Sequence, residues 1–229
     1  MIIDVIIPAY NEEHGVEKVI DNLPKYLIRE VIVCNNGSTD ATADRAAHAG
    51  ATVVHVQRQG YGAACLAGIT YLKSKAQNTQ PDIVVFIDAD YSDFPEELPS
   101  LIDPILYHGY EIVIGCRTQG KAGKGSLTPQ QVLGNRLASH LIRMIYGYRF
   151  SDLGPFRAIR WETLLRLDMQ DKNYGWTVEM QVKAAKLQLR YTEVPVSYRK
   201  RIGRSKVSGT LKGSILAGYK ILWTIFKLI

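Results

Sequence analysis

The chain has 229 residues, of which 46% are hydrophobic, and a formal net charge of +6 at pH 7. This length and composition predict one domain with a sizeable buried core. Three scattered cysteines, Cys34, Cys65 and Cys116, exclude a disulfide scaffold and indicate a reducing compartment. We expect no secretory signal peptide and no clean transmembrane helix, because no apolar run is long enough.

Five short apolar runs alternate with helix-like segments in the first 115 residues. Runs that are apolar on both faces are typical of strands in a mostly parallel sheet that helices cover on both sides. The alternation therefore predicts an α/β fold with a doubly wound, mostly parallel sheet. The predicted strands are 4–8, 30–34, 52–56, 82–88 and 111–115, and the helical segments between them are 11–27, 38–50, 62–76 and 95–109.

Residues 128–147 and 176–189 are predicted helices of the second half, with short strands at 154–160 and 190–196. Within 38–50 and 95–109, Ser38 is a plausible N-cap, and Gly50 and Gly109 are plausible C-terminal stops. We find no internal repeat or linker. The sequence thus predicts one domain, 1–213, followed by a C-terminal helix, 214–229.

The C-terminal helix is apolar around most of its circumference, with a narrow polar stripe of Lys220, Thr224 and Lys227. Three roles fit this pattern: packing on its own domain, lying in a membrane interface, or association with another protein. Residues 194–229 carry eight Lys or Arg and no acidic residue. This charge indicates an anionic partner, either phosphate groups or an anionic membrane surface, unless the segment is a solvated basic tail.

Asp88 and Asp90 stand at the end of the apolar run 82–88. Because residues i and i+2 of a strand point to the same face, we expect both carboxylates to converge at the carboxyl edge of the sheet. Two carboxylates so placed repel each other unless a cation lies beside them. Oxygen ligands of this kind suit Mg²⁺ or Mn²⁺ together with substrate phosphates. The alternative is an ordinary turn that leads into the helix after Pro95.

Polar residues also follow the first two predicted strands. Tyr10 offers an aromatic face, and the acidic residues at 12–13 suit the start of a helix. Asn35 and Asn36 can bond a base edge as both donor and acceptor, and Gly37 permits a tight turn. Ordinary capped turns explain both stretches equally well when each is taken alone.

Six stretches in order, "IIPAYNEE", "CNNGSTD", "FIDADYSDFPEE", "IGCRTQGK", "SDLGPFRAIR" and "EVPVSYRKRIGRSKVSGT", resemble the motifs of the family 2 inverting glycosyltransferases. Within that family the sequence is most similar to the dolichyl- or polyprenyl-phosphate hexose synthases. The resemblance covers residues 2–213. It implies a GT-A fold, a nucleotide-sugar donor and a divalent metal, Mg²⁺ or Mn²⁺, at Asp88 and Asp90.

The resemblance also implies roles for particular residues. Asp152, beside the reacting centre, and Arg117, facing the phosphates, are the catalytic candidates. The candidates for the nucleotide-sugar site are Pro8, Ala9, Tyr10, Glu12, Asn36, Asp88, Ala89, Asp90, Arg201 and Lys206. The candidates for the acceptor or its phosphate are Arg117, Arg136, Arg157, Arg199 and Ser205.

The sequence departs from the family pattern at two places. Asn35 and Asn36 are amides where the family usually has acids, which favours UDP over GDP, because an amide suits the mixed donor and acceptor edge of uracil. Ser92 lies where related lipid-phosphate enzymes often have Gln, so the resemblance leaves open the metal's third contact. Glu179, on the helix 176–189, corresponds to a position that approaches the active site, although a solvated face explains it nearly as well.

The predicted reaction is an inverting transfer of a hexose from a nucleotide-diphosphate sugar to a polyprenyl or dolichyl phosphate. Asp152 would be the general base if the acceptor were a saccharide hydroxyl, which is the main alternative. Other classes are a nucleotidyltransferase or a non-catalytic nucleotide-sugar-binding module, whereas the incomplete Gly pattern at 60–65 argues against a dinucleotide-dependent oxidoreductase. We expect peripheral contact with the cytoplasmic face of a membrane and no nucleic-acid binding. The sequence does not indicate the oligomeric state.

Overall fold

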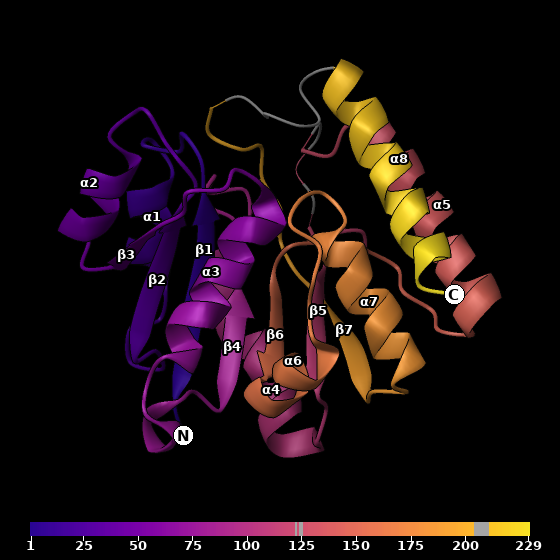
Figure 1. The fold of residues 1–229 in the computed structure, drawn as a ribbon, viewed down its shortest axis with the longest axis horizontal. Helices are drawn as coiled ribbons and strands as arrows, with labels where there is room; N and C mark the ends of the chain where they lie inside the picture. The colour runs from indigo at the N-terminus through magenta and orange to yellow at the C-terminus, as the bar shows by residue number, and fades with distance from the viewer. Residues whose placement is uncertain (122, 124–125, 204–210) are drawn as a thin grey trace.

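A seven-stranded sheet forms the centre of the protein, and helices cover both of its faces (Figure 1). The computed structural model describes residues 1–121, 123, 126–203 and 211–229, with only the backbone of 211–215. Across the sheet the order is β3-β2-β1-β4-β6-β5-β7. The strands are β1 (Ile3–Ala9), β2 (Glu30–Asn35), β3 (Thr52–His55), β4 (Ile83–Phe86), β5 (Ile112–Cys116), β6 (Arg157–Arg160) and β7 (Tyr191–Pro195).

The sheet is parallel except at β6. β1 pairs in parallel with β2 and β4, β2 with β3, and β5 with β7. Among the described strands, only β6 runs antiparallel, and it lies between β4 and β5. The predicted doubly wound, mostly parallel α/β sheet is confirmed. Because parallel strands end at the same edge, the segments that follow β1, β2 and β4 meet there.

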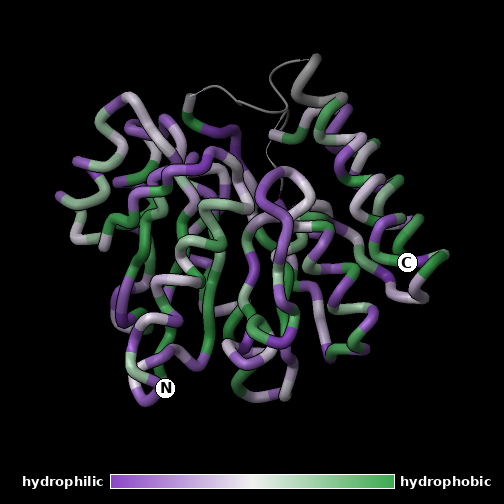
Figure 2. Tube along the Cα trace, viewed as in Figure 1, coloured by the Kyte–Doolittle hydropathy of each residue, from purple (hydrophilic) through white to green (hydrophobic). Residues whose placement is uncertain are grey.

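The helices form one hydrophobic core on each face of the sheet. The side chains of α1, α2 and α4 pack on one face, and those of α3, α5, α6, α7 and α8 pack on the other. Figure 2 shows the hydrophobic residues concentrated in the strands between these layers. The helices are α1 (Val16–Asn22), α2 (Thr42–His48), α3 (Tyr61–Lys73), α4 (Leu98–His108), α5 (Pro129–Tyr146), α6 (Trp161–Leu167), α7 (Trp176–Lys186) and α8 (Leu211–Lys227).

Some local predictions were wrong. The fourth strand ends at Phe86, where its ladders with β1 and β6 both stop, so the strand does not reach Asp88. Ser38 does not cap α2, which begins at Thr42; its hydroxyl instead accepts a hydrogen bond from the backbone N–H of Asn11 at 3.0 Å. The seven-residue helix α6 was not predicted, since it is too short for a clear helical period. By contrast, Gly109 ends α4 in the left-handed conformation, as predicted.

The C-terminal helix is continuous with the domain core. α8 begins at Leu211, before the predicted boundary at 214, and packs on α5 and α7 (Figure 1). Ile225 is fully buried in the core, and its carbonyl accepts a hydrogen bond from the Tyr146 hydroxyl at 2.9 Å. In the part of the chain that the structure describes, no helix is both long and apolar enough to cross a membrane.

α8 turns part of its polar stripe toward the protein and apolar residues toward the outside, whereas a solvated amphipathic helix would do the opposite. Lys220 pairs with Asp171 at 2.9 Å and Thr224 is buried, so these two residues of the polar stripe face the protein. The side that faces away is apolar, and α5 beside it exposes further apolar residues. We call this surface the outer apolar face; it comprises Leu133, Leu137 and Met144 of α5 and Leu216, Tyr219, Trp223 and Phe226 of α8.

Candidate active site

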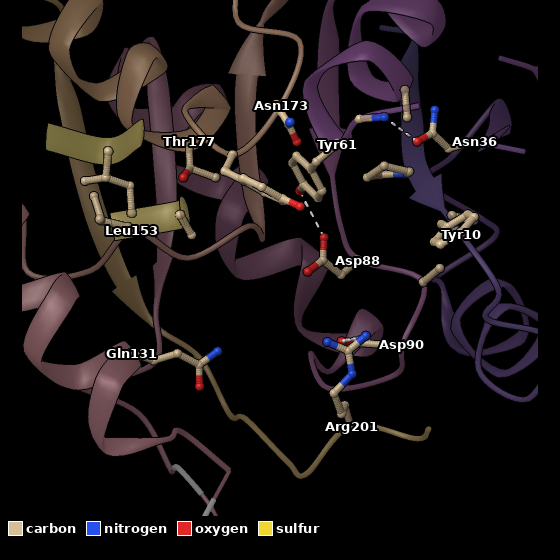
Figure 3. A pocket seen from close by; sticks show the side chains of 18 of the residues that line it. Tyr10, Asn36, Tyr61, Asp88, Asp90, Gln131, Leu153, Asn173, Thr177 and Arg201 are labelled. Atoms are coloured by element: carbon tan, nitrogen blue, oxygen red, sulfur yellow. Dashed lines mark hydrogen bonds and ion pairs between the residues drawn. The ribbon is translucent and has the colours of Figure 1, made fainter. Parts of the chain in front are cut away.

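A pocket of about 770 Å³ opens at the carboxyl edge of the sheet (Figure 3). This volume is in the range of small-molecule sites, about 300–1,000 Å³. The segments after β1, β2 and β4 form one side, and α5, α8 and the start of α7 form the other. The pocket brings together these predicted site residues: Pro8, Ala9, Tyr10, Glu12, Asn36, Asp88, Ala89, Asp90, Arg117 and Arg201.

Asp88 and Asp90 both line this pocket, but a turn beyond β4 places them there, rather than the alternation of a strand. The Tyr61 hydroxyl, at the start of α3, donates a hydrogen bond to Asp88 Oδ1 at 2.9 Å (Figure 3). Asp90 Oδ1 accepts from the Ser92 backbone N–H at 2.9 Å and from the Ser92 hydroxyl at 2.5 Å. Both carboxylates are therefore held in fixed positions.

The turn depends on two unusual backbone features. Tyr91 has a φ of +59°, in the left-handed region that non-glycine residues seldom adopt, at a cost of about 1–2 kcal/mol. Gly15, before α1, lies so close to the turn that a Cβ added there would be 2.5 Å from the Ala89 carbonyl oxygen. The absence of a side chain at Gly15 lets the start of α1 approach the two aspartates.

Arg201 reaches the same turn from the segment after β7. Its Nη2 lies 3.0 Å from Asp90 Oδ2 (Figure 3). The same atom lies 2.8 Å from Glu12 Oε1. Asp90 and Glu12 are nearly buried, whereas Arg201 is partly exposed. Burial lowers the pKa of Arg201, but the charges of Asp90 and Glu12 outweigh it, so the pKa is raised and the guanidinium stays charged.

A buried ion pair joins Arg117, after β5, to Asp152. The Arg117 Nε and backbone N–H both donate to Asp152 Oδ2 at 2.8 Å, and Nη2 donates to Oδ1 at 2.7 Å. Asn135 of α5 donates a further hydrogen bond to Oδ1 at 3.0 Å. Asp152 is fully buried behind Arg117, which lines the pocket. The bidentate contact orients the guanidinium of this pocket-lining residue.

The two amides after β2 are already bonded within the protein. Asn36 accepts from the Gly60 N–H at 2.7 Å and donates to the Arg58 carbonyl at 2.9 Å, so its amide holds the turn before α3 (Figure 3). Asn35 accepts from the Ser38 N–H at 3.1 Å. These bonds orient both amides toward the turns of the protein, and the predicted preference for uracil does not follow from Asn36 in this arrangement.

The family model of glycosyl transferase family 2 matches residues 4–167. This match spans most of the chain, including β1 to β6 and the turn that carries the two aspartates. The chain belongs to glycosyltransferase family 2. Because this is a family of glycosyl transferases, the nucleotidyltransferase and oxidoreductase alternatives do not apply. The protein is a hexosyltransferase with a GT-A fold.

Proteins similar to the chain include enzymes with different named substrates. An uncharacterised glycosyltransferase of Mycobacterium tuberculosis is 38% identical over 216 residues, 94% of each chain. The undecaprenyl-phosphate mannosyltransferase of Micrococcus luteus is 31% identical, with 91% of this chain and 88% of that one covered. Glucosyl-3-phosphoglycerate synthase of M. tuberculosis, solved with Mn²⁺, UDP-glucose and phosphoglyceric acid, superposes with a TM-score of 0.76 at 26% identity, over 99% of this chain and 79% of that one.

The cofactor of this family 2 glycosyltransferase is a divalent cation, as the solved structures with Mn²⁺ and UDP support. The site fits such an ion. Burial and the nearby charge of Asp90 raise the pKa of Asp88, which an added cation would relieve, and Asp90 and Glu12 already accept a positive group from Arg201. No cluster of three metal-binding side chains occurs among the described residues. Mg²⁺ is usually held by one or two carboxylates together with substrate phosphates.

Other predicted site residues of this family 2 glycosyltransferase lie away from the pocket. Arg157 is fully buried and donates to the carbonyls of Gly154 and Thr177, so it cannot reach a phosphate as we predicted. Arg199 stacks 3.7 Å from the ring centroids of Tyr91 and Phe94 instead of facing the pocket. Arg136 is exposed on α5 and does not line the pocket. Ser205 and Lys206 lie outside the described residues.

Some residues of the site were missed. Gln131, Gly134 and Asn135 of α5 line the pocket, and so do residues before and in α7 and α8. The role of Asn135 could not be predicted from the sequence, because no motif around it indicates a hydrogen bond to Asp152. Glu179 does not approach the pocket: it is buried, and its carboxylate accepts from the backbone N–H groups of Gln170 and Asp171, which holds the loop before α7.

The raised pKa of Asp88 makes the stability of the metal-free enzyme depend on pH. Burial, followed by the charge of Asp90, raises this pKa from an ordinary value of 3.8 to about 7. The folded state therefore binds a proton that the unfolded state releases, and stability falls as pH rises from about 4 to about 7. Asp88→Asn should remove this loss, so its melting temperature with EDTA should exceed that of the wild type by more at pH 8 than at pH 5.

We expect the difference in melting temperature to grow by a few degrees between pH 5 and pH 8. A change of about 1 kcal/mol in the free energy of unfolding shifts the melting temperature of a domain of this size by about 2–4 °C. Differential scanning fluorimetry across this pH range measures it. Asp103→Asn, on the exposed side of α4, controls for the loss of one negative charge. A difference that stays constant from pH 5 to pH 8 would contradict the raised pKa.

Proposed function

We propose that this enzyme transfers a hexose from a nucleotide-diphosphate sugar to the phosphate of a polyprenyl or dolichyl lipid, with inversion at the anomeric carbon. One observation carries the proposal. The inner sides of α5 and α8 line the pocket through Gln131, Gly134, Ala217 and Gly218, while the outer sides of the same helices form the outer apolar face. An acceptor with a polar head and an apolar tail suits this combination.

The outer apolar face has the composition of a surface that rests in a membrane interface. It carries Trp, Tyr, Phe and Leu side chains, and Tyr219 stacks on Trp223 at 6.4 Å. Exposed cations lie on the same two helices, at Arg136, Arg143 and Lys227. Apolar and aromatic residues beside cations favour binding to an anionic bilayer without spanning it. The Micrococcus luteus relative, named for an undecaprenyl-phosphate acceptor, supports the same acceptor class.

In the proposed reaction, an oxygen of the acceptor phosphate attacks the anomeric carbon as the bond to the donor diphosphate breaks. The nucleoside diphosphate leaves with the electron pair. No base is needed, because a phosphate monoester, with a second pKa of about 6, is mostly dianionic at neutral pH. Asp88 and Asp90 would hold the divalent cation, which would neutralise charge on the departing diphosphate. Arg117 faces the pocket with its guanidinium fixed by Asp152 and would bind a phosphate oxygen.

An acceptor hydroxyl is the second candidate. Glucosyl-3-phosphoglycerate synthase, whose fold is similar, was solved with phosphoglyceric acid, a small soluble acceptor. A hydroxyl would need a general base, and Asp152 was the candidate for it. Both Asp152 oxygens accept hydrogen bonds from Arg117, and the side chain is fully buried. This arrangement favours a positioning role for Asp152 and therefore the phosphate acceptor.

The donor nucleotide is UDP or GDP. The UDP-glucose bound in the similar synthase supports UDP. We place the protein at the cytoplasmic face of a membrane, a proposal that its three unpaired cysteines support.

A donor panel tests the function directly. UDP-glucose, UDP-galactose, UDP-N-acetylglucosamine and GDP-mannose are each incubated with Mn²⁺ or Mg²⁺, with polyprenyl phosphate or with phosphoglyceric acid. We expect one donor to yield a sugar-lipid only when polyprenyl phosphate is present. Transfer to phosphoglyceric acid without transfer to the lipid would overturn the proposed acceptor.

Replacing Trp223 and Phe226 together by Ser should weaken binding to vesicles that contain an anionic lipid. We expect the affinity for these vesicles to fall at least about tenfold. Loss of the two rings removes apolar area whose burial in the membrane contributes about 1.4 kcal/mol or more to binding. Co-sedimentation measures it. The matched control replaces Tyr26 and Tyr107, which are 83% and 74% exposed on other surfaces, by Ser. Equal binding of both double variants would contradict docking through α8.

A further inference from the structure

A positive side chain of this protein already lies at Asp90, one of the two carboxylates expected to hold the metal. Arg201 Nη2 contacts Asp90 Oδ2 and Glu12 Oε1, at 3.0 and 2.8 Å (Figure 3). The Asp90 side chain is 4% exposed, so its charge has little solvation by water. Without a nearby cation, such a buried carboxylate would be costly. Arg201 therefore neutralises this side of the pocket.

The contact uses the oxygen of Asp90 that a metal would need. Asp90 Oδ1 is taken by two hydrogen bonds from Ser92, which leaves Oδ2 facing the pocket. Mg²⁺ binds oxygen ligands at about 2.0–2.1 Å, much closer than the two charged groups of an ion pair approach each other. A guanidinium that kept its place at Oδ2 would face this ion at short range, and the two positive charges would repel each other.

The backbone around Arg201 lets the side chain move without moving the segment. The neighbouring Ile202 N–H donates to the Asp90 carbonyl at 3.0 Å, and the Arg199 N–H donates to the Ser92 carbonyl at 2.9 Å. Arg199 also stacks on Tyr91 and Phe94. These contacts fix residues 199–202 beside the aspartate turn. Rotation of the Arg201 side chain alone can then carry its guanidinium from Asp90 into the pocket.

We propose that Arg201 exchanges partners during donor binding: it pairs with Asp90 and Glu12 in the free enzyme and moves to the donor diphosphate when the metal takes its place at Asp90. A diphosphate is a strong partner for an arginine, because the planar guanidinium can donate two parallel hydrogen bonds. The inference rests on the metal and the nucleotide-diphosphate donor of the proposed function. It does not depend on the acceptor.

The exchange makes metal and nucleotide bind cooperatively. Metal alone must displace Arg201 from Asp90 while no diphosphate is present, so the guanidinium loses one partner, keeps at most its contact with Glu12, and the metal binds weakly. When the nucleotide diphosphate is present, the displaced guanidinium gains a partner and the metal binds more tightly. Coupling between two ligands is typically about 5–150-fold, and by linkage each ligand strengthens the other by the same factor.

Binding of Mn²⁺ to the full chain tests the exchange, by electron paramagnetic resonance of free Mn²⁺ with and without UDP or GDP. Arg201→Gln should bind Mn²⁺ alone about tenfold more tightly than the wild type, and bind the nucleotide with Mn²⁺ present about tenfold more weakly. The coupling factor should fall accordingly. Lys200→Gln, at the exposed neighbouring position, removes the same charge and should change neither affinity more than about twofold.

Weaker binding of Mn²⁺ alone to Arg201→Gln, or a change no larger than that of Lys200→Gln, would overturn the exchange. Arg201→Lys retains the charge without the planar fork, and we expect its affinity for Mn²⁺ alone to stay near that of the wild type. A gain in that variant equal to the gain in Arg201→Gln would also overturn it. If the wild type binds no Mn²⁺ with either nucleotide, both the exchange and the proposed donor chemistry fail; failure of lipid transfer alone affects only the acceptor.

Discussion

Replacing Asp90 by Asn should lower sugar transfer by at least about 10²- to 10³-fold, the usual loss when one group that stabilises developing charge is removed. The Asn side chain is nearly the same size, and its oxygen can still accept both hydrogen bonds from Ser92. The amide nitrogen would then face Arg201, where Asp90 now presents a charged oxygen. The variant should fold normally but lose a ligand of the divalent cation.

Steady-state transfer from the preferred donor, measured over a range of Mn²⁺ concentrations, checks this expectation. A raised Mn²⁺ requirement should accompany the loss of rate, because the carboxylate binds the ion. Ser92→Ala removes one hydrogen bond to Asp90 but no charge, and we expect a loss below about tenfold from it. Full activity of Asp90→Asn, or transfer by the wild type in EDTA, would refute the role of the aspartate pair.

Replacing Arg117 by Met should have the second large effect, on both stability and rate. Asp152 would remain fully buried and keep only its bonds from the Arg117 backbone N–H and from Asn135. Breaking a buried ion pair by removing one partner typically costs about 3–5 kcal/mol. Transfer should also fall by about 10²-fold or more, since the guanidinium faces the pocket.

Urea unfolding separates the two effects. The double variant Arg117→Met with Asp152→Asn should regain part of the lost stability, because no uncompensated charge remains, while its activity stays low. Destabilisation of the single variant below about 1 kcal/mol would show that the pair is not buried in solution.

Asp152→Asn alone tests how Asp152 acts. In the positioning role, it should retain measurable transfer to a lipid phosphate, and the loss should be smaller than for Arg117→Met. Complete loss of transfer with unchanged donor binding would instead indicate a general base. The pH dependence of the residual activity distinguishes the two, since only a base that titrates during turnover would alter the profile.

Local patterns in the sequence were sufficient for the fold and the family, and they also placed several of the predicted donor-site residues at one pocket. The apolar runs of β1, β2 and β4 predict parallel strands, and parallel strands bring their carboxyl ends to one edge. Residues that follow those ends closely, such as Tyr10 and Asp88, are therefore brought to that edge by the topology, and the turn after β4 sets the position of Asp88. The resemblance to family 2 rested on the same contiguous stretches, and the family match confirms it.

What the sequence could not provide was the pairing of side chains from distant segments. Arg201 meets Asp90, Arg117 meets Asp152, and the Asn36 amide is taken up by the turn at 58–60. Arg157 was predicted to contact a phosphate and is instead buried against backbone carbonyls. In each case the charge and residue type suggest a contact with a ligand. Neither shows whether the side chain instead bonds to another group of the protein.

In the C-terminal helix, too, the sequence determined some features and the tertiary structure determined others. Its sequence determined that 215–229 is apolar with a polar stripe, and this was enough to expect a helix. Only the tertiary structure decided its rotation, because Lys220 finds Asp171 and Ile225 enters the core, which leaves Trp223 facing outward. A helical period fixes which residues share a face. Which face is turned inward depends on the free energy of packing against α5 and α7, to which segments far apart in the chain contribute.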